Sequence, residues 1–455
     1  MNNFALRSKR VITPNGVKAA TLIIKNGLID TILPYESVVN CDLIDHGNLV
    51  IMPGLVDTHV HINEPGRTDW EGFNTATQAA AAGGITTLVD MPLNCIPATV
   101  TKEALDIKLQ ALKGKLWVDC GFWGGVIPES LYNNGAQLDE LLSAGVLGAK
   151  SFLIHSGVDE FPNVSATDVK KALPIMAKYQ VPYLIHAELD KAHNEAQEIG
   201  DKYQSFLDSR PRKWENDAID LMVSLGEEAK AVGVDAHIHI VHLSSSDALE
   251  KITYAKNAGL KFTAETCPHY LTLFSEEIPD GKTLFKCCPP IREDENRQKL
   301  WQALKAGDID FIVSDHSPCT PELKKIDSGD LENAWGGISA LQFGLPLIWT
   351  EAKQRGFTLS DISHLMSTAT ARFVGLDDKK GKITVGAYAD LLVFDDEKEV
   401  IISSDMIKHR HKITPYVGKK VIGEVIKTYL RGQLVYSEQD IIGQPQGNTL
   451  LKHDY

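Results

Sequence analysis

Short runs of β-branched and other apolar residues alternate along the middle of the chain with longer segments in which apolar residues recur at helical spacing. This alternation is typical of successive strand–helix units, because buried strands and amphipathic helices differ in their hydrophobic period. The candidate strands cover residues 54–62, 84–92, 118–126, 148–154, 181–188, 237–245, 261–270 and 310–318, and the candidate helices cover 71–82, 101–113, 167–179, 214–232, 246–258 and 294–306. Strands and helices in this order predict an α/β fold with a (β/α)8 TIM barrel over residues 54–375.

The two ends of the chain show a different pattern. Residues 1–53 and 376–455 contain short apolar runs separated by Asn-Gly and Gly turns, which favour small antiparallel strands over helices. Two arrangements fit this pattern: two independent β extensions, or one composite β-sandwich domain beside the barrel. An isolated small sheet is only marginally stable in water. We therefore predict the composite sandwich, with residues 1–53 as its N-terminal part and 376–455 as its C-terminal part.

Ionisable residues stand near the carboxyl ends of the candidate barrel strands, where the active sites of such barrels lie. His59 and His61 are two residues apart in the first strand, so their side chains project to the same face. A single buried histidine is more often a hydrogen-bonded core group than a ligand. The later strands, however, supply further ionisable groups: Lys150, His186, His242, His269, Asp315 and His316. Because such groups are almost never buried without a partner, their convergence predicts a metal site.

The residue types indicate which metal this site would take. Imidazole and carboxylate ligands suit zinc and similar divalent ions, and the sequence has no set of soft thiolate ligands. Lys150 differs from the others, because an ammonium group has no lone pair for a metal. A desolvated lysine can lose its proton and then add CO2 to form a bridging carbamate. A salt bridge inside the barrel is the alternative, and physical chemistry alone leaves the two interpretations level.

Composition narrows the choice of partner and compartment. The formal charge of -14, with acids and bases mixed along 455 residues, argues against nucleic acid and anionic membranes as partners. The seven cysteines include no CxxC pair and form no recognisable disulfide framework. The N-terminal stretch lacks the apolar core of a signal peptide, and no apolar stretch is long enough to span a bilayer. We expect a cytoplasmic protein that acts on a small molecule.

Several long motifs carry a resemblance to a known family. The stretch "DTHVHINEPG" at residues 57–66 resembles the metal-binding opening of the cyclic amidohydrolases, which include dihydroorotases, hydantoinases, dihydropyrimidinases and allantoinases. Other stretches are similar to the allantoinase branch: "EPGRTDWEG" (64–72), "DMPLNCIPATV" (90–100), "ETCPHYL" (265–271), "CCPPIR" (287–292), "SDHSPCTPELK" (314–324), "AWGGISALQ" (334–342) and "HRHKITPYVGKKVIG" (409–423). The similarity runs through nearly the whole chain, and motifs of this length make chance a poor explanation.

The resemblance implies a site with two divalent metal ions, with zinc first and cobalt, manganese or iron as alternatives. By position, His59, His61 and Asp315 would hold the more buried ion. His186 and His242 would hold the other ion, and N6-carboxylated Lys150 would bridge the pair, which decides between its two interpretations. The resemblance further implies hydrolysis of allantoin to allantoate with Asp315 as the proton carrier, and a homo-oligomer, often a tetramer.

Asn63 separates the members of the family. Dihydroorotases carry an arginine here that grips the substrate carboxylate, whereas an amide offers an uncharged donor and acceptor suited to neutral allantoin. A turn-forming role in a loop is the alternative for Asn63. Further candidate substrate contacts are Asn94, Cys287, Trp335, Gly336 and Gly337, and the polar loop 319–333 is a candidate lid. The alternative functions are a hydantoinase or dihydropyrimidinase and, from another class, a scaffold relative without catalysis.

Overall fold

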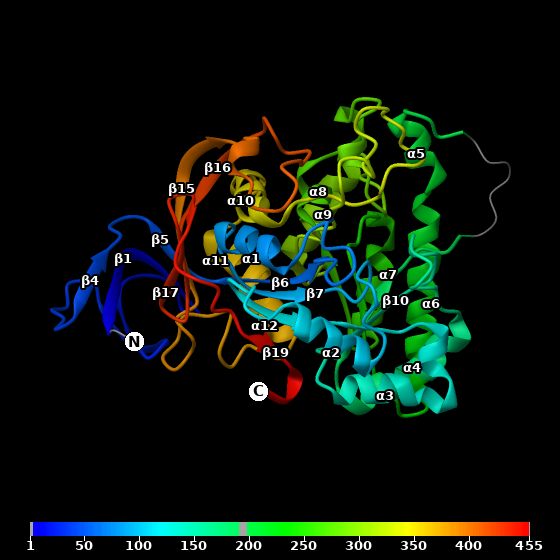
Figure 1. The fold of residues 1–455 in the computed structure, drawn as a ribbon, viewed down its shortest axis with the longest axis horizontal. Coiled ribbons are helices and arrows are strands. Elements are labelled where there is room, and N and C mark those ends of the chain that lie inside the picture. The colour runs from blue at the N-terminus through cyan, green and yellow to red at the C-terminus, as the bar shows by residue number, and fades with distance from the viewer. Residues whose placement is uncertain (1–2, 191–197, 455) are drawn as a thin grey trace.

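The computed structural model describes residues 3–190 and 198–454, in which a parallel barrel lies beside a large, mostly antiparallel sheet (Figure 1). The barrel strands are β6 Leu55–Val60, β7 Ile85–Asp90, β8 Asp119–Phe122, β10 Ala149–Phe152, β11 Pro182–His186, β12 His237–Ile240, β13 Phe262–Thr266 and β14 Phe311–Ile312, and β9 Gly124–Gly125 follows β8 and pairs with β10. Neighbouring strands are parallel, and a bridge between Val60 and His316 closes the cylinder. Each of the candidate strands contains one of these strands, and the predicted TIM barrel is confirmed.

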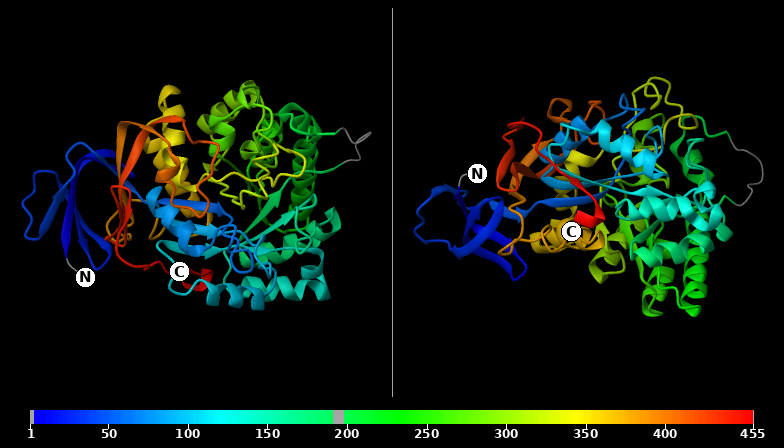
Figure 2. Two further views of the ribbon diagram at one scale, coloured as in Figure 1. Left: turned by 45° about the horizontal axis from the view of Figure 1, so that its top comes forward. Right: turned by 60° about the horizontal axis from the view of Figure 1, so that its bottom comes forward.

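Helices surround the barrel in both views of Figure 2. They are α1 Phe73–Ala82, α2 Lys102–Ala111, α3 Ala136–Ser143, α4 Ala166–Tyr179, α5 Tyr203–Ser209, α6 Arg212–Ala231, α7 Leu249–Asn257, α8 Pro268–Thr272, α9 Asp294–Ala306, α10 Gly344–Gln354, α11 Leu359–Ser363 and α12 Ala369–Phe373. In α4 the buried residues Val169, Leu173 and Met176 follow helical spacing, and Ser165 caps the first turn. Within the two described ranges, no helix is long and apolar enough to cross a membrane.

The second sheet combines strands from both ends of the chain. The N-terminal part supplies β1 Phe4–Thr13, β2 Gly16–Lys25, β3 Leu28–Pro34, β4 Asp42–Asp45 and β5 Val50–Pro53, and the C-terminal part supplies β15 Leu391–Ile401, β16 Lys420–Leu430, β17 Gln433–Ser437 and β18 Asp440–Ile441. The strand order is β18-β17-β16-β15-β5-β1-β2-β3, with β4 paired to β1. β5 and β15 join the two parts as an antiparallel pair, in which Met52 lies opposite Leu392. The composite origin of this unit is therefore as predicted.

A buried ion cluster and the last strand connect the sheet to the barrel. Lys380 Nζ lies 2.7 Å from a carboxylate oxygen of Asp119 in β8 and 2.7 Å from one of Asp390, just before β15. Arg431, at the end of β16, also binds Asp119, at 2.6 Å. Beyond the sheet, β19 Thr449–Leu450 pairs in parallel with β8, so the chain returns to the barrel. The two sheets are thus joined by charges and by backbone hydrogen bonds.

Candidate metal centre

The residues expected to bind metal lie at one end of the barrel. His59, Lys150 and His186 are within or at the end of their strands β6, β10 and β11. Three further residues follow the ends of their strands by one to three positions: His61 after β6, His242 after β12 and Asp315 after β14. All six residues are buried. The backbone of His242 and of Asp315 has φ values of 39° and 44°. Residues other than glycine adopt this strained conformation mostly where function requires it.

His59, His61 and Asp315 form one compact group. Asp315 Oδ1 lies 3.2 Å from His59 Nε2 and 3.7 Å from His61 Nε2. One ligand atom of each residue lies within 4.8 Å of the other two, which is close enough to hold a metal ion. Lys150 Nζ lies 3.3 Å from His59 Nε2, at the edge of the same group. These four side chains, from β6 and its end, from β10 and from the loop after β14, therefore face one small volume.

His186 and His242 form a neighbouring pair. His186 Nδ1 lies 3.0 Å from His242 Nε2, and the ring of His242 is 5.4 Å from that of His59. Glu188 accepts a hydrogen bond of 2.7 Å from His186 Nε2 and one of 2.5 Å from Arg210. A carboxylate in this position fixes the orientation of an imidazole. The pair adjoins the first group, so all six candidate ligands converge.

Burial sets the charge state of these groups. It lowers the pKa of His59, His61 and His242 well below the usual value, so the rings are in the neutral form that binds metals. Burial also lowers the pKa of Lys150 to about 8, although Asp315 and Glu265 oppose this shift. A neutral amine is the form of lysine that adds CO2. The electrostatics therefore suit both a cation between the rings and a carbamate on Lys150.

The donor set fits a divalent metal. Neutral imidazoles with a carboxylate are the ligands that zinc prefers in proteins. His242 Nδ1 is buried and has no hydrogen-bond partner among residues 3–190 and 198–454. His59 Nε2 and His61 Nε2 both lie close to Oδ1 of Asp315, an arrangement that a shared cation would stabilise. The described residues thus include a group able to hold a metal ion.

Asn63 and Asn94 lie against this group. Asn63 Nδ2 donates to the carbonyl of Pro318 at 3.2 Å, in the loop that follows Asp315. Asn94 Nδ2 lies 3.4 Å from His61 Nδ1, so it contacts a candidate ligand directly. The Oδ1 atoms of both asparagines are buried without a partner among the described residues. Each amide therefore keeps an acceptor for a bound molecule.

Arg67 is close to Asn63 in the sequence, but it does not take the role of the arginine that dihydroorotases carry at position 63. Its guanidinium forms an ion pair with Glu160, donates to the carbonyl of Asn94 at 2.8 Å and lies over the ring of Trp70. Trp70 in turn contacts Trp335 in an edge-on arrangement, with ring centres 4.7 Å apart. Arg67 is thus occupied in joining loops of the barrel mouth.

The segment Trp335–Gly337 packs against the loop after Asp315. A Cβ atom at Gly337 would lie 2.3 Å from the carbonyl oxygen of Ser317, and one at Gly336 would lie 3.1 Å from Cys288 Sγ. Close backbone approach therefore requires glycine at position 337. The buried Lys324 holds the segment by donating to the carbonyls of Trp335 and Gly337 at 2.9 and 2.5 Å.

Cys287, the remaining candidate contact, is a buried thiol. Its Sγ lies 3.3 Å from the carbonyl of Pro289, and burial raises the pKa of the thiol well above its usual value. A protonated thiol of this kind is neither a nucleophile nor a metal ligand. Of the two adjacent cysteines, Cys288 contacts the glycine segment.

The comparison with known families decides the identity of the fold. The Amidohydrolase family matches residues 50–435. The chain belongs to the amidohydrolase family. Among similar amidohydrolases, an allantoinase from Arabidopsis thaliana is 45% identical over 450 residues, which cover 96% of this chain and 88% of the relative. An allantoinase from Streptomyces avermitilis is 47% identical over 451 residues, with 98% of each chain covered.

Solved structures give the same architecture. The L-hydantoinase (dihydropyrimidinase) from Arthrobacter aurescens superimposes with a TM-score of 0.90 at 27% sequence identity, covering 99% of this chain and 100% of that one. A D-hydantoinase superimposes with a TM-score of 0.86, also at 27% identity, over 99% and 98% of the two chains. This amidohydrolase therefore resembles hydantoinases in structure and allantoinases more closely in sequence.

Two residues of this amidohydrolase site gain a role that the sequence did not reveal. Glu188 contacts His186, as described, and Glu265 accepts a hydrogen bond from His59 Nδ1. His269 was expected near the site but not in a specific role; it is buried, and neither ring nitrogen has a partner among the described residues. Strand alternation carried the signal, since Glu188 follows His186 by two positions and so projects to the same side.

Proposed function

We propose that this amidohydrolase is an allantoinase, which hydrolyses the cyclic amide bond of allantoin to give allantoate. Asn63 is the observation that carries the proposal. Its uncharged amide lies beside the loop of Asp315 and keeps a buried, unpartnered Oδ1. Allantoin is a neutral ring with N–H donors and carbonyl acceptors, and it suits an amide rather than a cation. The identities of 45% and 47% to two allantoinases support the same substrate.

The proposed cofactors are two divalent metal ions. His59, His61 and Asp315 would hold one ion, His186 and His242 would hold the other, and N6-carboxylated Lys150 would lie between them. Zinc is the first choice for this ligand set, with cobalt, manganese and iron as alternatives. When bound, such ions acidify water and polarise a carbonyl group. The lowered pKa of Lys150 supports its carboxylation.

Asp315 is the proposed proton carrier. Hydrolysis joins the oxygen of water to the ring carbonyl carbon, breaks the carbon–nitrogen bond and delivers a proton to the departing nitrogen. Burial raises the pKa of the Asp315 carboxyl, which suits a group that takes a proton and gives it up again. Trp70 and Trp335 pack edge to face, and Trp70 lies under Arg67, which donates to the carbonyl of Asn94.

A hydantoinase or dihydropyrimidinase is the second candidate. The TM-score of 0.90 to a structure named L-hydantoinase (dihydropyrimidinase) favours it. The deciding assay offers allantoin, hydantoin and dihydrouracil in parallel and follows ring opening. We expect allantoin to give the highest kcat/KM. Faster turnover of hydantoin or dihydrouracil would contradict the first proposal and support the second.

The same assay tests the metal site. Chelation with dipicolinate should abolish hydrolysis, and zinc add-back should restore it. His59→Ala should lose activity and bound metal together, whereas His453→Ala, at an exposed position, should keep both. If chelated protein and His59→Ala keep full activity, the proposed site is wrong. If neither metal nor turnover of any of the three rings is found, a scaffold relative becomes the better interpretation.

We further propose a homo-oligomer, with a tetramer as the first choice by family analogy, and a cytoplasmic location. The seven free cysteines support a reducing compartment. One similar protein, from Aquarana catesbeiana, is named a mitochondrial allantoinase. Cell fractionation should therefore compare the amount of this protein in the cytoplasm and in mitochondria. Native mass measurement gives the number of subunits.

A further inference from the structure

A line of hydrogen-bonded side chains runs through the inside of the barrel and ends at His59. At the outer end, His237 Nε2 and His239 Nδ1 each lie 2.8 Å from Thr263 Oγ1. His239 Nε2 lies 3.0 Å from Glu265 Oε2, and Glu265 Oε1 contacts His59 Nδ1. These residues come from the adjacent strands β12 and β13 and from β6. The line therefore connects the two ends of the barrel.

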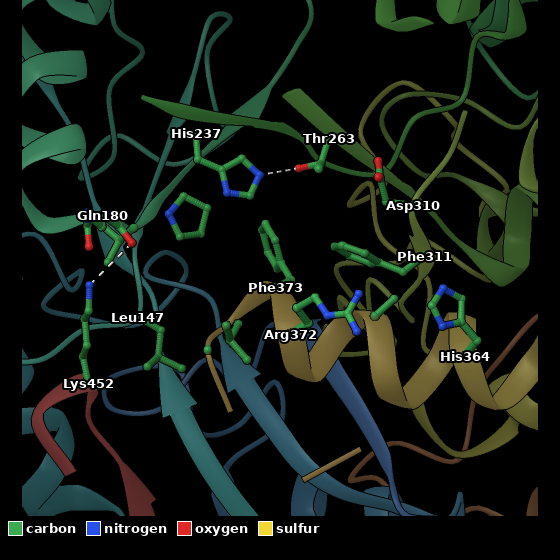
Figure 3. A pocket seen from close by; sticks show the side chains of 15 residues that line it. Leu147, Gln180, His237, Thr263, Asp310, Phe311, His364, Arg372, Phe373 and Lys452 are labelled. Atoms are coloured by element: carbon green, nitrogen blue, oxygen red, sulfur yellow. Dashed lines mark hydrogen bonds between the residues drawn. The ribbon is translucent and has the colours of Figure 1, made fainter. Parts of the chain in front are cut away.

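The outer end of this line opens on a cavity of about 460 Å³ at the N-terminal end of the strands. Figure 3 shows His237 and Thr263 on its wall, with Phe373 below them. The ring of Phe373 packs 5.5 Å from that of His237 and 4.3 Å from that of His239. This cavity lies at the opposite end of the barrel from the candidate metal centre, which the line reaches through Glu265 at His59.

The hydrogen positions along the line follow from the chemistry of each group. Glu265 Oε1 also lies 3.3 Å from the backbone nitrogen of His242, which can only donate. An ionised carboxylate can only accept, so with Glu265 ionised His59 holds its hydrogen on Nδ1. A neutral imidazole has one N–H, so His59 Nε2 keeps a lone pair. That atom faces Asp315 and Lys150, at 3.2 and 3.3 Å.

The outer half of the line is consistent with the inner half. His239 Nε2 donates to Glu265 Oε2, which leaves Nδ1 as an acceptor for the Thr263 hydroxyl hydrogen. The Thr263 oxygen then accepts from His237 Nε2. Each histidine and Thr263 donate once, Glu265 only accepts, and no two donors face each other. Glu265 is thus held from both sides, because His239 is fixed by Thr263.

We propose that Glu265 is a positioning residue of the metal site, which holds His59 in the tautomer that offers the Nε2 lone pair to the metal. The inference rests on the proposed metal site, and it assigns Glu265 no contact with the substrate. The hydrogen bond and the negative charge of Glu265 can be tested separately. An amide at this position can still accept from His59 Nδ1 without carrying a charge, whereas an apolar side chain can do neither.

The test measures the zinc affinity of the metal-free, full-length protein by competition with a fluorescent zinc chelator. Glu265→Met removes both acceptors and should weaken zinc binding tenfold or more, the usual scale for the loss of such a partner. Glu265→Gln keeps an acceptor for His59 and should bind zinc at least tenfold more tightly than Glu265→Met. If Glu265→Met does not fold, Glu265→Ala replaces it with the same expectation.

Asp390→Asn provides the matched control, because Asp390 is a buried carboxylate of the Lys380 cluster and not part of the barrel mouth. It should lower the urea unfolding midpoint and leave zinc affinity within twofold of the wild type. Equal losses in Glu265→Gln and Glu265→Met would mean that Glu265 acts by charge alone, and unchanged affinity in both would make it an ordinary core group. Either result overturns the proposal while leaving the metal site intact. A wild-type protein that binds no zinc would overturn both.

Discussion

Lys380→Met gives the sharpest test of how the sheet and the barrel are joined. Lys380 is 2% exposed and contacts Asp119 and Asp390 at 2.7 Å each. Burial alone would lower the pKa of Lys380, but the two carboxylates raise it well above the usual value. Removing one member of such a buried cluster typically costs about 3–5 kcal/mol, because the remaining charges stay buried without their partner.

The surrounding contacts place the expected loss near the lower end of that range. Asp119 keeps Arg431 at 2.6 Å and the backbone nitrogen of Asn448 at 2.8 Å, whereas Asp390 keeps only the backbone nitrogen of Arg431 at 2.7 Å in the described part of the chain. We therefore expect a loss of about 3 kcal/mol in the free energy of unfolding. Urea unfolding followed by circular dichroism and tryptophan fluorescence measures it.

Lys25→Met is the matched control for this experiment. Lys25 pairs with Asp30 at 2.9 Å in the N-terminal part of the sheet, but 46% of the Lys25 side chain and 37% of the Asp30 side chain are exposed. Exposed pairs contribute about 0–1 kcal/mol. If Lys380→Met unfolds at the same urea concentration as Lys25→Met, the cluster does not stabilise the junction and the reasoning is refuted.

Three further predictions concern pH, the glycine segment and metal. Burial lowers the pKa of His409 to about 3, so between pH 6.5 and 3 the unfolded chain binds a proton that the folded chain does not, and stability falls as the pH falls. His409→Asn should reduce the pH dependence of the free energy of unfolding by up to about 1.4 kcal/mol per pH unit, as obtained from unfolding midpoints at each pH. An unchanged pH dependence would contradict the lowered pKa of His409. Gly337→Ala places a Cβ atom 2.3 Å from the Ser317 carbonyl and should lower kcat/KM for allantoin about tenfold or more in steady-state kinetics. An unchanged kcat/KM would mean that the segment does not border the substrate. Dipicolinate should lower the thermal midpoint, and zinc at about 100 times its Kd should restore about 2.7 kcal/mol; identical melting curves would argue against a metal in the folded protein.

Hydrophobic periodicity was sufficient to predict the fold, because a barrel strand and its following helix each leave a local pattern. Residues 237–245, for example, alternate in a way that a helix cannot bury, and they contain β12. The composite sheet was predictable because neither chain end could form a stable sheet alone. The return of β19 to β8 left no such signal, since two residues are too short to show a period.

The candidate site was less accessible from the sequence than the fold. The residues at the strand ends indicated the ligand types. Side-chain alternation places His237 and His239 on the same side of β12, but it does not show how far along the barrel axis each side chain lies. Depth distinguishes a ligand from a residue that supports one, and it depends on how the strands pack around the barrel axis. Glu265 was overlooked for this reason. The backbone conformations of Asn63 and Asn94, with φ near 66° and 69°, also became evident only in three dimensions.

The pairing of β5 with β15 bears on how the protein is made. The N-terminal strands leave the ribosome before the barrel, so β5 can pair with β1 early but waits for Leu391–Phe394 before its second edge is paired. The whole barrel is synthesised in the interval, and during that time Val50–Pro53 present an unpaired, apolar strand edge. Such an edge is prone to pairing with other nascent chains. Efficient production of this protein should therefore depend on chaperones that protect the N-terminal strands until β15 emerges.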